Sequence, residues 1–208
     1  MIMKRDLNAL QEIELDILRE VGNIGAGHAA TALSTLIQKT IDMEVPKVNI
    51  VSFADIGELL GGEEQIMVSV FLRVEGDAPG NLLFMLTLDS AKELVEQIVY
   101  SEESNSDEFN DMEYSALKEI GNILAGSYLS SLADFTNLTL LPTVPAVTID
   151  MVGAILGFGL IQVSQVSDVA IVIDTTFLEG DRKVEGHFFL IPDPDSFDIL
   201  FNALGVNW

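Results

Sequence analysis

Two groups of polar residues recur in the sequence with the same spacing. Asp16, Glu20 and Asn23 stand four and three residues apart, and Pro46 follows Asn23 after 22 intervening residues. Residues three or four positions apart share one face of a helix, so the first three would form a polar stripe. Ninety-nine positions later the same layout returns as Ser115, Glu119, Asn122 and Pro145. A single stripe is typical of a solvated helix face, whereas its repetition indicates a functional site.

The residue types in both stripes suit the positioning of water rather than acid–base chemistry. An asparagine amide cannot act as a general base, but it donates and accepts hydrogen bonds and can hold a water for attack. Phosphoryl transfer depends mainly on positioning and on charge stabilisation supplied by a metal. A glutamate three residues earlier could bind a cation on the protein that carries the phosphoryl group. We therefore interpret each stripe as a docking carboxylate and a water-positioning amide; the alternative is ordinary helix surface.

Other kinds of catalytic centre have less support in the sequence. Asp16 and Glu20 could bind a hard cation as carboxylates four residues apart, but Ser115 replaces the acid in the second copy. We therefore expect no metal to be bound by this chain. His28 and His187 have no evident nucleophile partner, and we expect each to make a local hydrogen bond. The absence of cysteine excludes disulfides, thiolate zinc sites and thiol nucleophiles.

Composition restricts the partners and the location of the chain. The 208 residues carry a net charge of −23, which disfavours nucleic acid and favours either basic partners or simple solubility. Residues 1–6 are charged and lack the apolar core of a signal peptide. The longest uncharged run, Met151–Ser167, contains Gln, Ser and Gly and is too polar for a membrane span. We predict a cytoplasmic protein without membrane insertion.

Hydrophobic periodicity and turn residues predict the elements that must position these side chains. The first half is predicted to contain a long helix (7–40), a strand (41–53), a short helix (54–62), two strands (65–74 and 80–88) and a helix (91–100). The second half is predicted to contain a long helix from Asn110, a strand (138–149), a counterpart of the short helix (151–166), strands (169–177 and 185–191) and a closing helix (193–204). The acidic stretch 101–109 reads as a linker.

The two halves match element by element, which indicates an internal duplication. We predict an α+β fold with pseudo-twofold symmetry, in which repeats of about 7–100 and 110–206 form a single domain, 1–208. Three strands per half are few for independent stability, so the repeats are expected to share one six-stranded sheet, with both long helices on one face. Because the duplication already supplies this pairing, we expect a monomer.

Three glycines interrupt the first long helix at Gly22, Gly25 and Gly27. Each interior glycine costs about 1 kcal/mol relative to alanine, so their presence needs a reason. Close packing against another backbone is one reason, and room for the surface of a partner is another. Both can hold together.

The spacing Asp/Ser-x3-Glu-x2-Asn-x22-Pro resembles the signature of the CheC, CheX and FliY family of phosphatases, which dephosphorylate the chemotaxis response regulator CheY. Both copies fit without a gap, and the resemblance extends over essentially the whole chain. It includes the flanking segments 20–27 and 119–126. Two intact copies in one chain are similar to the CheC members of this family. The rotor protein FliM shares the fold but lacks these residues.

The resemblance implies a role for each residue of the two copies. Glu20 or Glu119 would pair with the active-site lysine of phosphorylated CheY, and Asn23 or Asn122 would orient the attacking water. The remaining four, Asp16, Pro46, Ser115 and Pro145, would shape the site. The phosphoryl group and Mg²⁺ would belong to CheY, so no cofactor is expected in this chain.

The resemblance also implies a second partner, the receptor-modifying deamidase CheD. The candidate surface for CheD is the apolar segment Asp150–Val166, which begins at Asp150; the alternative is that this segment is a buried short helix. Two other functions stay open at this point. One is a non-catalytic adaptor that holds CheD or a phosphorylated receiver, and the other is a phosphatase of a different response regulator.

Overall fold

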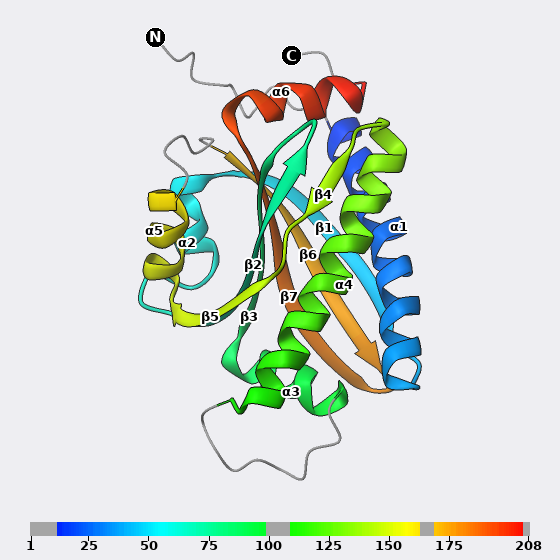
Figure 1. The fold of residues 1–208 in the computed structure, drawn as a ribbon, viewed down its shortest axis with the longest axis vertical. Coiled ribbons are helices and arrows are strands. Elements are labelled where there is room, and N and C mark those ends of the chain that lie inside the picture. The colour runs from blue at the N-terminus through cyan, green and yellow to red at the C-terminus, as the bar shows by residue number, and fades with distance from the viewer. Residues whose placement is uncertain (1–11, 99–108, 163–168, 206–208) are drawn as a thin grey trace.

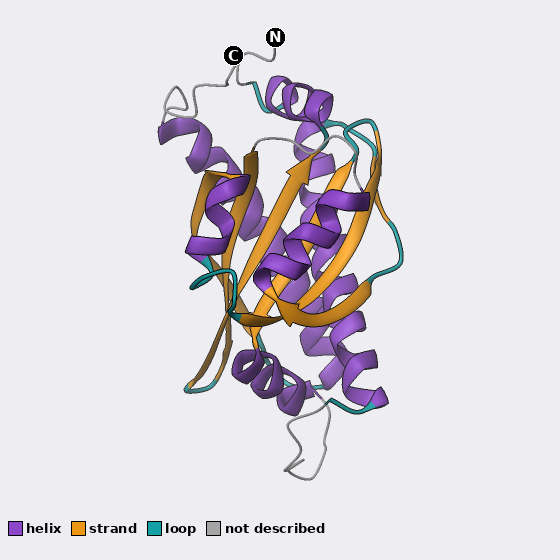
Figure 2. Ribbon diagram, turned by 90° about the vertical axis from the view of Figure 1, so that its left-hand side faces the viewer, coloured by secondary structure: helices purple, strands orange, loops and turns teal. Residues whose placement is uncertain are grey.

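An antiparallel sheet forms the middle layer of the molecule, with helices on both faces (Figure 1). The computed structural model describes residues 12–98, 109–162 and 169–205. The long helices α1 (Glu12–Ile37) and α4 (Asp111–Thr136) run in opposite directions on one face. The opposite face carries α2 (Ile56–Leu59), preceded by the 3-10 turn η2 (Phe53–Asp55), and α5 (Val152–Gln162), as the side view shows (Figure 2). Two further helices, α3 (Leu88–Ile98) and α6 (Pro194–Ala203), lie at the two ends of the sheet.

The order of the strands interlinks the two repeats. The strands are β1 (Asp42–Ser52), β2 (Ile66–Gly76), β3 (Gly80–Thr87), β4 (Leu140–Pro142), β5 (Ala146–Met151), β6 (Val169–Glu179) and β7 (Arg182–Pro192). They follow one another across the sheet as β1-β6-β7-β3-β2, and both β4 and β5 pair with β2. The first strand of each repeat thus pairs with the second strand of the other repeat. The predicted α+β fold with one shared sheet is confirmed.

The centre of the pseudo-symmetry lies between β3 and β7. Phe84 and Phe188 are register partners there, and their ring centroids are 5.4 Å apart. They are 104 positions apart in sequence, as are Gly76 and Gly180, which turn the two equivalent hairpins with positive φ. Equivalent residues of the two repeats therefore meet at the centre of the sheet.

One predicted strand is divided in the structure. The strand expected over residues 138–149 consists of β4 and β5, so that seven strands occupy six positions of the sheet. Three residues, 143–145, lie opposite only Leu72 and Arg73 of β2, which is one residue too many for a regular ladder. Such an extra residue produces a bulge, and Pro145 has no N–H with which to continue the pairing.

The long helices begin and end where local chemistry favours it. Asn110 caps α4: its side chain accepts hydrogen bonds from the backbone of Met112 and Glu113, and Glu113 accepts one from the Asn110 N–H at 2.7 Å. This is a capping box. Both long helices are followed at equivalent positions by a left-handed residue, Gln38 (φ 56°) and Asn137 (φ 57°). The linker predicted before Asn110 lies mostly outside the described residues.

Two hydrophobic cores hold the layers together. The larger lies between the sheet and the long helices, and it contains Val21, Leu33 and Leu124. The smaller lies under α2 and α5 and contains Phe189 and Val152. Burial of this apolar surface is the main term that favours the fold.

Close approach of backbones explains some of the helical glycines. A Cβ on Gly25 would lie 2.8 Å from Tyr128 Cδ1 and 3.1 Å from the Tyr128 Cα, where α1 packs against α4. A Cβ on Gly121 would lie 3.0 Å from the Val70 Cβ in β2. Gly25 therefore packs against another backbone, as the packing interpretation predicts for the first long helix, whereas Gly121 is confined by a valine side chain.

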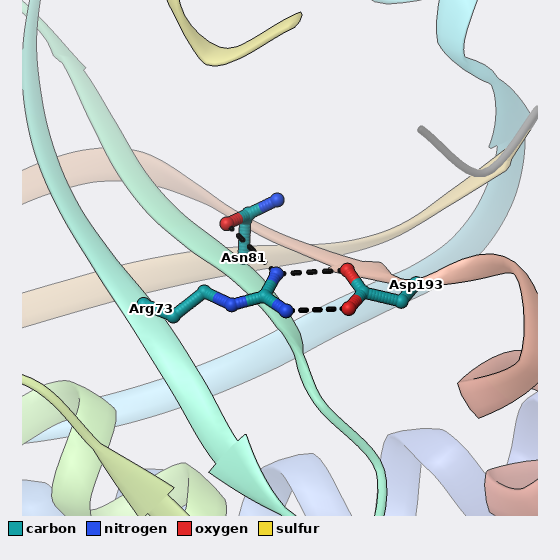
Figure 3. Close-up of polar contacts among 3 residues, drawn as sticks. All are labelled: Arg73, Asn81 and Asp193. Atoms are coloured by element: carbon teal, nitrogen blue, oxygen red, sulfur yellow. Dashed lines mark hydrogen bonds and ion pairs between the residues drawn. The ribbon is translucent and has the colours of Figure 1, made fainter. Parts of the chain in front are cut away.

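A polar cluster joins the two repeats at one end of the sheet (Figure 3). Arg73 of β2 binds both carboxylate oxygens of Asp193, which precedes α6, with 2.8 Å between Nη1 and Oδ1. Arg73 Nη1 also donates to Asn81 Oδ1 at 3.3 Å. The hydrogen bond to Asp193 raises the pKa of Arg73 above its usual value. Fork-shaped pairs of this kind fix geometry as well as charge.

Candidate functional site

The structure places both glutamate–asparagine pairs on the outer surface of the long helices. Glu20 and Asn23 lie on α1, Glu119 and Asn122 lie on α4, and all four side chains are exposed. The apolar sides of the same helices face the sheet. Each pair is therefore presented to solvent, and the spacing of three residues puts its two side chains next to each other.

Asn23 is anchored at the junction between α1 and β1. Its Oδ1 accepts a hydrogen bond from the Val45 N–H at 3.1 Å, and its Nδ2 donates to the Arg19 carbonyl at 3.0 Å. An amide side chain has two donor hydrogens and two acceptor lone pairs. Half of this capacity remains for a water or a partner, while the amide is held in one orientation.

The signature proline explains why the Val45 N–H is available. The register of β1 and β6 shifts between Glu44 and Lys47, so that Val45 and Pro46 together face one residue, Thr175. This bulge releases the Val45 N–H from the ladder, and proline has no N–H to be left unpaired. Asn23 and Pro46 are thus separated by 22 residues because the Asn23 side chain on α1 meets β1 at the bulge that contains Pro46.

The second copy has the same bulge but different contacts. Pro145 stands in the bulge described between β4 and β5. The preceding valine, Val144, is 88% exposed, whereas Val45 is 3% exposed and packs near Gly22. In the described part of the chain the Asn122 side chain makes no hydrogen bond. The Asn23 amide is therefore fixed by hydrogen bonds and, within the described residues, the Asn122 amide is not, although the two asparagines have equivalent positions in the repeated sequence.

The first position of each stripe also differs between the copies. Asp16 forms an exposed ion pair with Arg19, with 2.9 Å between Oδ1 and Nη2. Ser115 donates from its hydroxyl to the Asp111 carbonyl one turn earlier, at 2.9 Å. Exposed ion pairs contribute little to stability. Neither contact reaches the glutamate or the asparagine of its own copy.

Both histidines make a side-chain hydrogen bond, and that of His187 is local, as expected from the sequence. His28 Nδ1 lies 3.4 Å from Ser131 Oγ, across the contact between α1 and α4. His187 Nδ1 lies 2.8 Å from Asp174 Oδ1, across β6 and β7. The expectation is confirmed for His187, whose partner is its register neighbour in the same hairpin, and wrong for His28, whose partner lies on the other long helix.

No metal site and no membrane span are found among the described residues. No group of three or more His, Asp or Glu side chains in residues 12–98, 109–162 and 169–205 could hold a metal ion. None of the helices described is long and apolar enough to cross a membrane.

Comparisons with known proteins place the chain in a family. The CheC-like family matches residues 13–50 and 112–149, two blocks that run from the long helix into the strand after it in each repeat. The CheY-P phosphatase CheC of Bacillus subtilis (strain 168) is 44% identical over 204 residues, which cover 96% of this chain and 98% of the relative. The chain belongs to the CheC-like family.

Solved structures of lower identity share the fold of this CheC-like chain. FliY from Thermotoga maritima superimposes with a TM-score of 0.74 at 22% identity, covering 95% of this chain and 98% of that one. The FliM middle domain from H. pylori superimposes with a TM-score of 0.65 at 13% identity, covering 93% and 99%. Proteins with only 13–22% sequence identity to this chain thus have the same fold.

Sequence reasoning missed two contributors to the site of this CheC-like chain. Arg19 pairs with Asp16 and accepts from Asn23 through its carbonyl oxygen. Val45 supplies the N–H that anchors Asn23. A Val-Pro dipeptide precedes the strand core in both copies. That repetition was the available signal for the bulge.

The segment predicted to bind CheD is partly exposed and partly buried. Asp150 lies exposed at the end of β5, and its Oδ1 accepts a hydrogen bond from the Met151 N–H at 2.8 Å. Val152 and Ile155 of α5 are buried in the smaller core. Residues 163–166 of the predicted segment lie outside the described residues. Because Val152 and Ile155 belong to the smaller core, only the exposed residues of this segment could contact CheD.

Proposed function

We propose that this protein is a phosphatase that accelerates hydrolysis of the aspartyl phosphate of CheY. The 44% identity to a CheY-P phosphatase over nearly the whole chain supports the proposal. The observation that carries it is the presentation of Glu and Asn side by side on an exposed helix face, once in each repeat.

In the proposed mechanism the protein completes the active site of the receiver. Glu20 or Glu119 pairs with the lysine of the receiver, which holds the motif helix against the phosphorylated aspartate. Asn23 or Asn122 accepts a hydrogen bond from a water and orients its oxygen towards phosphorus. As the new P–O bond forms, the bond between phosphorus and the aspartate oxygen breaks, and inorganic phosphate and a free carboxylate result. The receiver's Mg²⁺ stabilises the transferred charge, so this chain supplies only positioning.

The anchoring of Asn23 supports this role physically. Its amide is held by Val45 on one side and Arg19 on the other, with one hydrogen and one lone pair unused. A preorganised amide does not have to reorient during the reaction, which is the property that positional catalysis requires. The net charge of −23 favours association with a partner surface that is basic.

Phosphate release from phosphorylated CheY in the presence of Mg²⁺ tests the proposal. The wild-type protein should shorten the half-life of the phosphorylated receiver. A variant that combines Asn23→Ala with Asn122→Ala should lose this acceleration and retain its far-UV circular dichroism. Retention of the wild-type rate by the double variant would refute the assigned roles. A panel of phosphorylated receivers from the same organism separates CheY from a different response regulator as the substrate.

A non-catalytic adaptor is the alternative, favoured by the exposed surface around Asp150. There the side chains of Ile66 and Met151, which are register partners, are each 46% exposed. We propose that CheD binds this surface. An adaptor would bind phosphorylated CheY or CheD without changing the half-life of the phosphoryl group. Calorimetric titration of CheD into wild-type and Asp150→Ala protein tests the assignment, because a wild-type affinity in the variant would contradict it.

The monomeric state and the cytoplasmic location stay predictions.

A further inference from the structure

The helical glycines that recur in both repeats fall into two classes. Gly22 and Gly121 face strands: a Cβ there would lie 3.4 Å from Val45 Cγ1 in the first case and 3.0 Å from the Val70 Cβ in the second. Gly27 and Gly126 differ, because a Cβ built at either position meets no atom within 4 Å other than the local backbone of its own helix. Packing inside the molecule therefore explains the first class and leaves the second unexplained.

Backbone conformation does not explain the second class either. Gly27 and Gly126 lie in the middle of α1 and α4, and neither has a positive φ. Glycine is the least favourable residue for a helix interior apart from proline. The chain thus has, at equivalent positions in both repeats, a residue that weakens the helix without relieving any contact or strain.

Their place on the helix connects these glycines with the candidate site. Gly27 follows Asn23 by four residues and Glu20 by seven, and Gly126 has the same relation to Asn122 and Glu119. These intervals extend the stripe of each helix by one turn. Beside this stripe Ile24 is 45% exposed, an apolar side chain available to a partner.

The surface is also hollowed at this point. A groove of about 630 Å³ begins at Gly27 and follows α1 along Thr31 and Thr35 to the start of β1 at Asp42. Its lining is mostly small and polar. Gly27, one helical turn beyond Asn23, therefore lies at one end of this groove.

We propose that Gly27 and Gly126 are contact positions for the phosphorylated receiver, where its surface meets the helix backbone directly. This inference rests on the proposed function. The absence of a side chain lets the receiver approach closely enough for the asparagine one turn away to reach the attacking water. A methyl group there would hold the two surfaces apart, and a misplacement of about 1 Å can slow a positioned reaction roughly 100-fold. Both glycines are positioning residues, since they touch the receiver rather than the reacting atoms.

The test is a variant carrying Gly27→Ala and Gly126→Ala, with Gly157→Ala as its matched control. Gly157 is also a helical glycine with open space around its Cβ, but it lies in α5 on the opposite face of the sheet, in the segment offered to CheD, which is absent from this assay. Alanine favours the helix in every case, so both proteins should melt higher than wild type, by about 2–4 °C per substitution. The double variant should lose at least about tenfold in kcat/KM for phosphorylated CheY, while Gly157→Ala keeps the wild-type value.

Two readouts keep the inference separate from the proposed function. The first is kcat/KM for phosphorylated CheY, and the second is the calorimetric affinity for the receiver with beryllofluoride bound in place of the phosphoryl group. A double variant that is more stable and retains wild-type kcat/KM and affinity would overturn the inference, and so would one that is less stable than wild type. If the wild-type protein binds the receiver without hastening hydrolysis, the proposed function fails, and weaker binding by the double variant still supports the contact. If the wild-type protein does not bind, both fail.

Discussion

Replacing Asn23 by alanine should lower the free energy of unfolding, whereas the same replacement at Asn122 should not. Asn23 accepts the Val45 N–H at 3.1 Å, and this donor belongs to a bulge whose neighbours are paired with β6. The Asn122 side chain makes no hydrogen bond in the described part of the chain. The two asparagines therefore form a matched pair of substitutions in which only one removes a contact.

The magnitude follows from three contributions. Loss of a partly buried hydrogen bond costs about 1 kcal/mol. The Val45 N–H, left without its partner beside a valine side chain only 3% exposed, adds up to about 1 kcal/mol. Alanine is the better helix former by about 0.5 kcal/mol, which offsets part of the loss at Asn23 and is a net gain at Asn122. The two variants should thus differ by roughly 1.5 kcal/mol in unfolding free energy.

Urea unfolding followed by far-UV circular dichroism measures this difference. With a urea dependence of about 2–3 kcal/mol per molar, the midpoints of the two variants should be separated by roughly 0.5 M. Asn23→Asp is a useful control, because it keeps an oxygen acceptor for the Val45 N–H and should unfold at a higher urea concentration than Asn23→Ala. Equal midpoints for Asn23→Ala and Asn122→Ala would show that the bond to Val45 contributes nothing to stability.

Three further substitutions test the contacts that hold the site in place. Gly25→Ala should lower the melting temperature, because its Cβ would lie 3.1 Å from the Tyr128 backbone and overpacking costs about 1–3 kcal/mol; an unchanged value contradicts that contact. Burial raises the pKa of Tyr128 to about 12, with a hydrogen bond to Thr175 opposing it, so its contribution to stability is present below pH 10 and lost as pH rises towards 12. Tyr128→Phe should flatten this alkaline loss in pH-dependent unfolding, and an equally steep loss would assign it to other groups. Asp193→Ala should cost about 2 kcal/mol in chemical unfolding by leaving Arg73 without its carboxylate, and a wild-type midpoint would show that the pair contributes nothing.

Local patterns were sufficient to predict most of the elements. The first strand was expected at 41–53 and is observed as Asp42–Ser52. The counterpart of the short helix, expected at 151–166, is helical over Val152–Gln162, as its place in the repeat indicated. Periodicity succeeds for the long helices because one face of each is buried against the larger core. The division of the strand predicted at 138–149 was not foreseen, since a bulge is defined by the partner strand, and the sequence does not say which strand that is.

The exposed side chains of the candidate site were predictable from the sequence, whereas the contacts that hold them in place were not. The spacing of Glu20 and Asn23 was enough to place them together, because helix geometry alone relates residues three apart. The bond from Val45 to Asn23 was not predictable, since it depends on how β1 docks under α1. The open space around Gly27 required the structure as well, because sequence alone left both packing and partner contact as reasons for the glycine.

The two repeats show how one sequence signature can act through different local structures. In the first, the residue before the proline is buried beneath the helix and its N–H anchors the asparagine. In the second, Val144 is turned out to solvent and Val70 of β2 lies against Gly121 instead. The proline is common to both because both strands bulge at that point. The bulge accounts for the proline in both copies, whereas the hydrogen bond that anchors the asparagine is found in the first copy and not in the described contacts of the second. In the proposed mechanism, Asn122, whose amide has no such anchor among the described residues, would be oriented by the receiver itself.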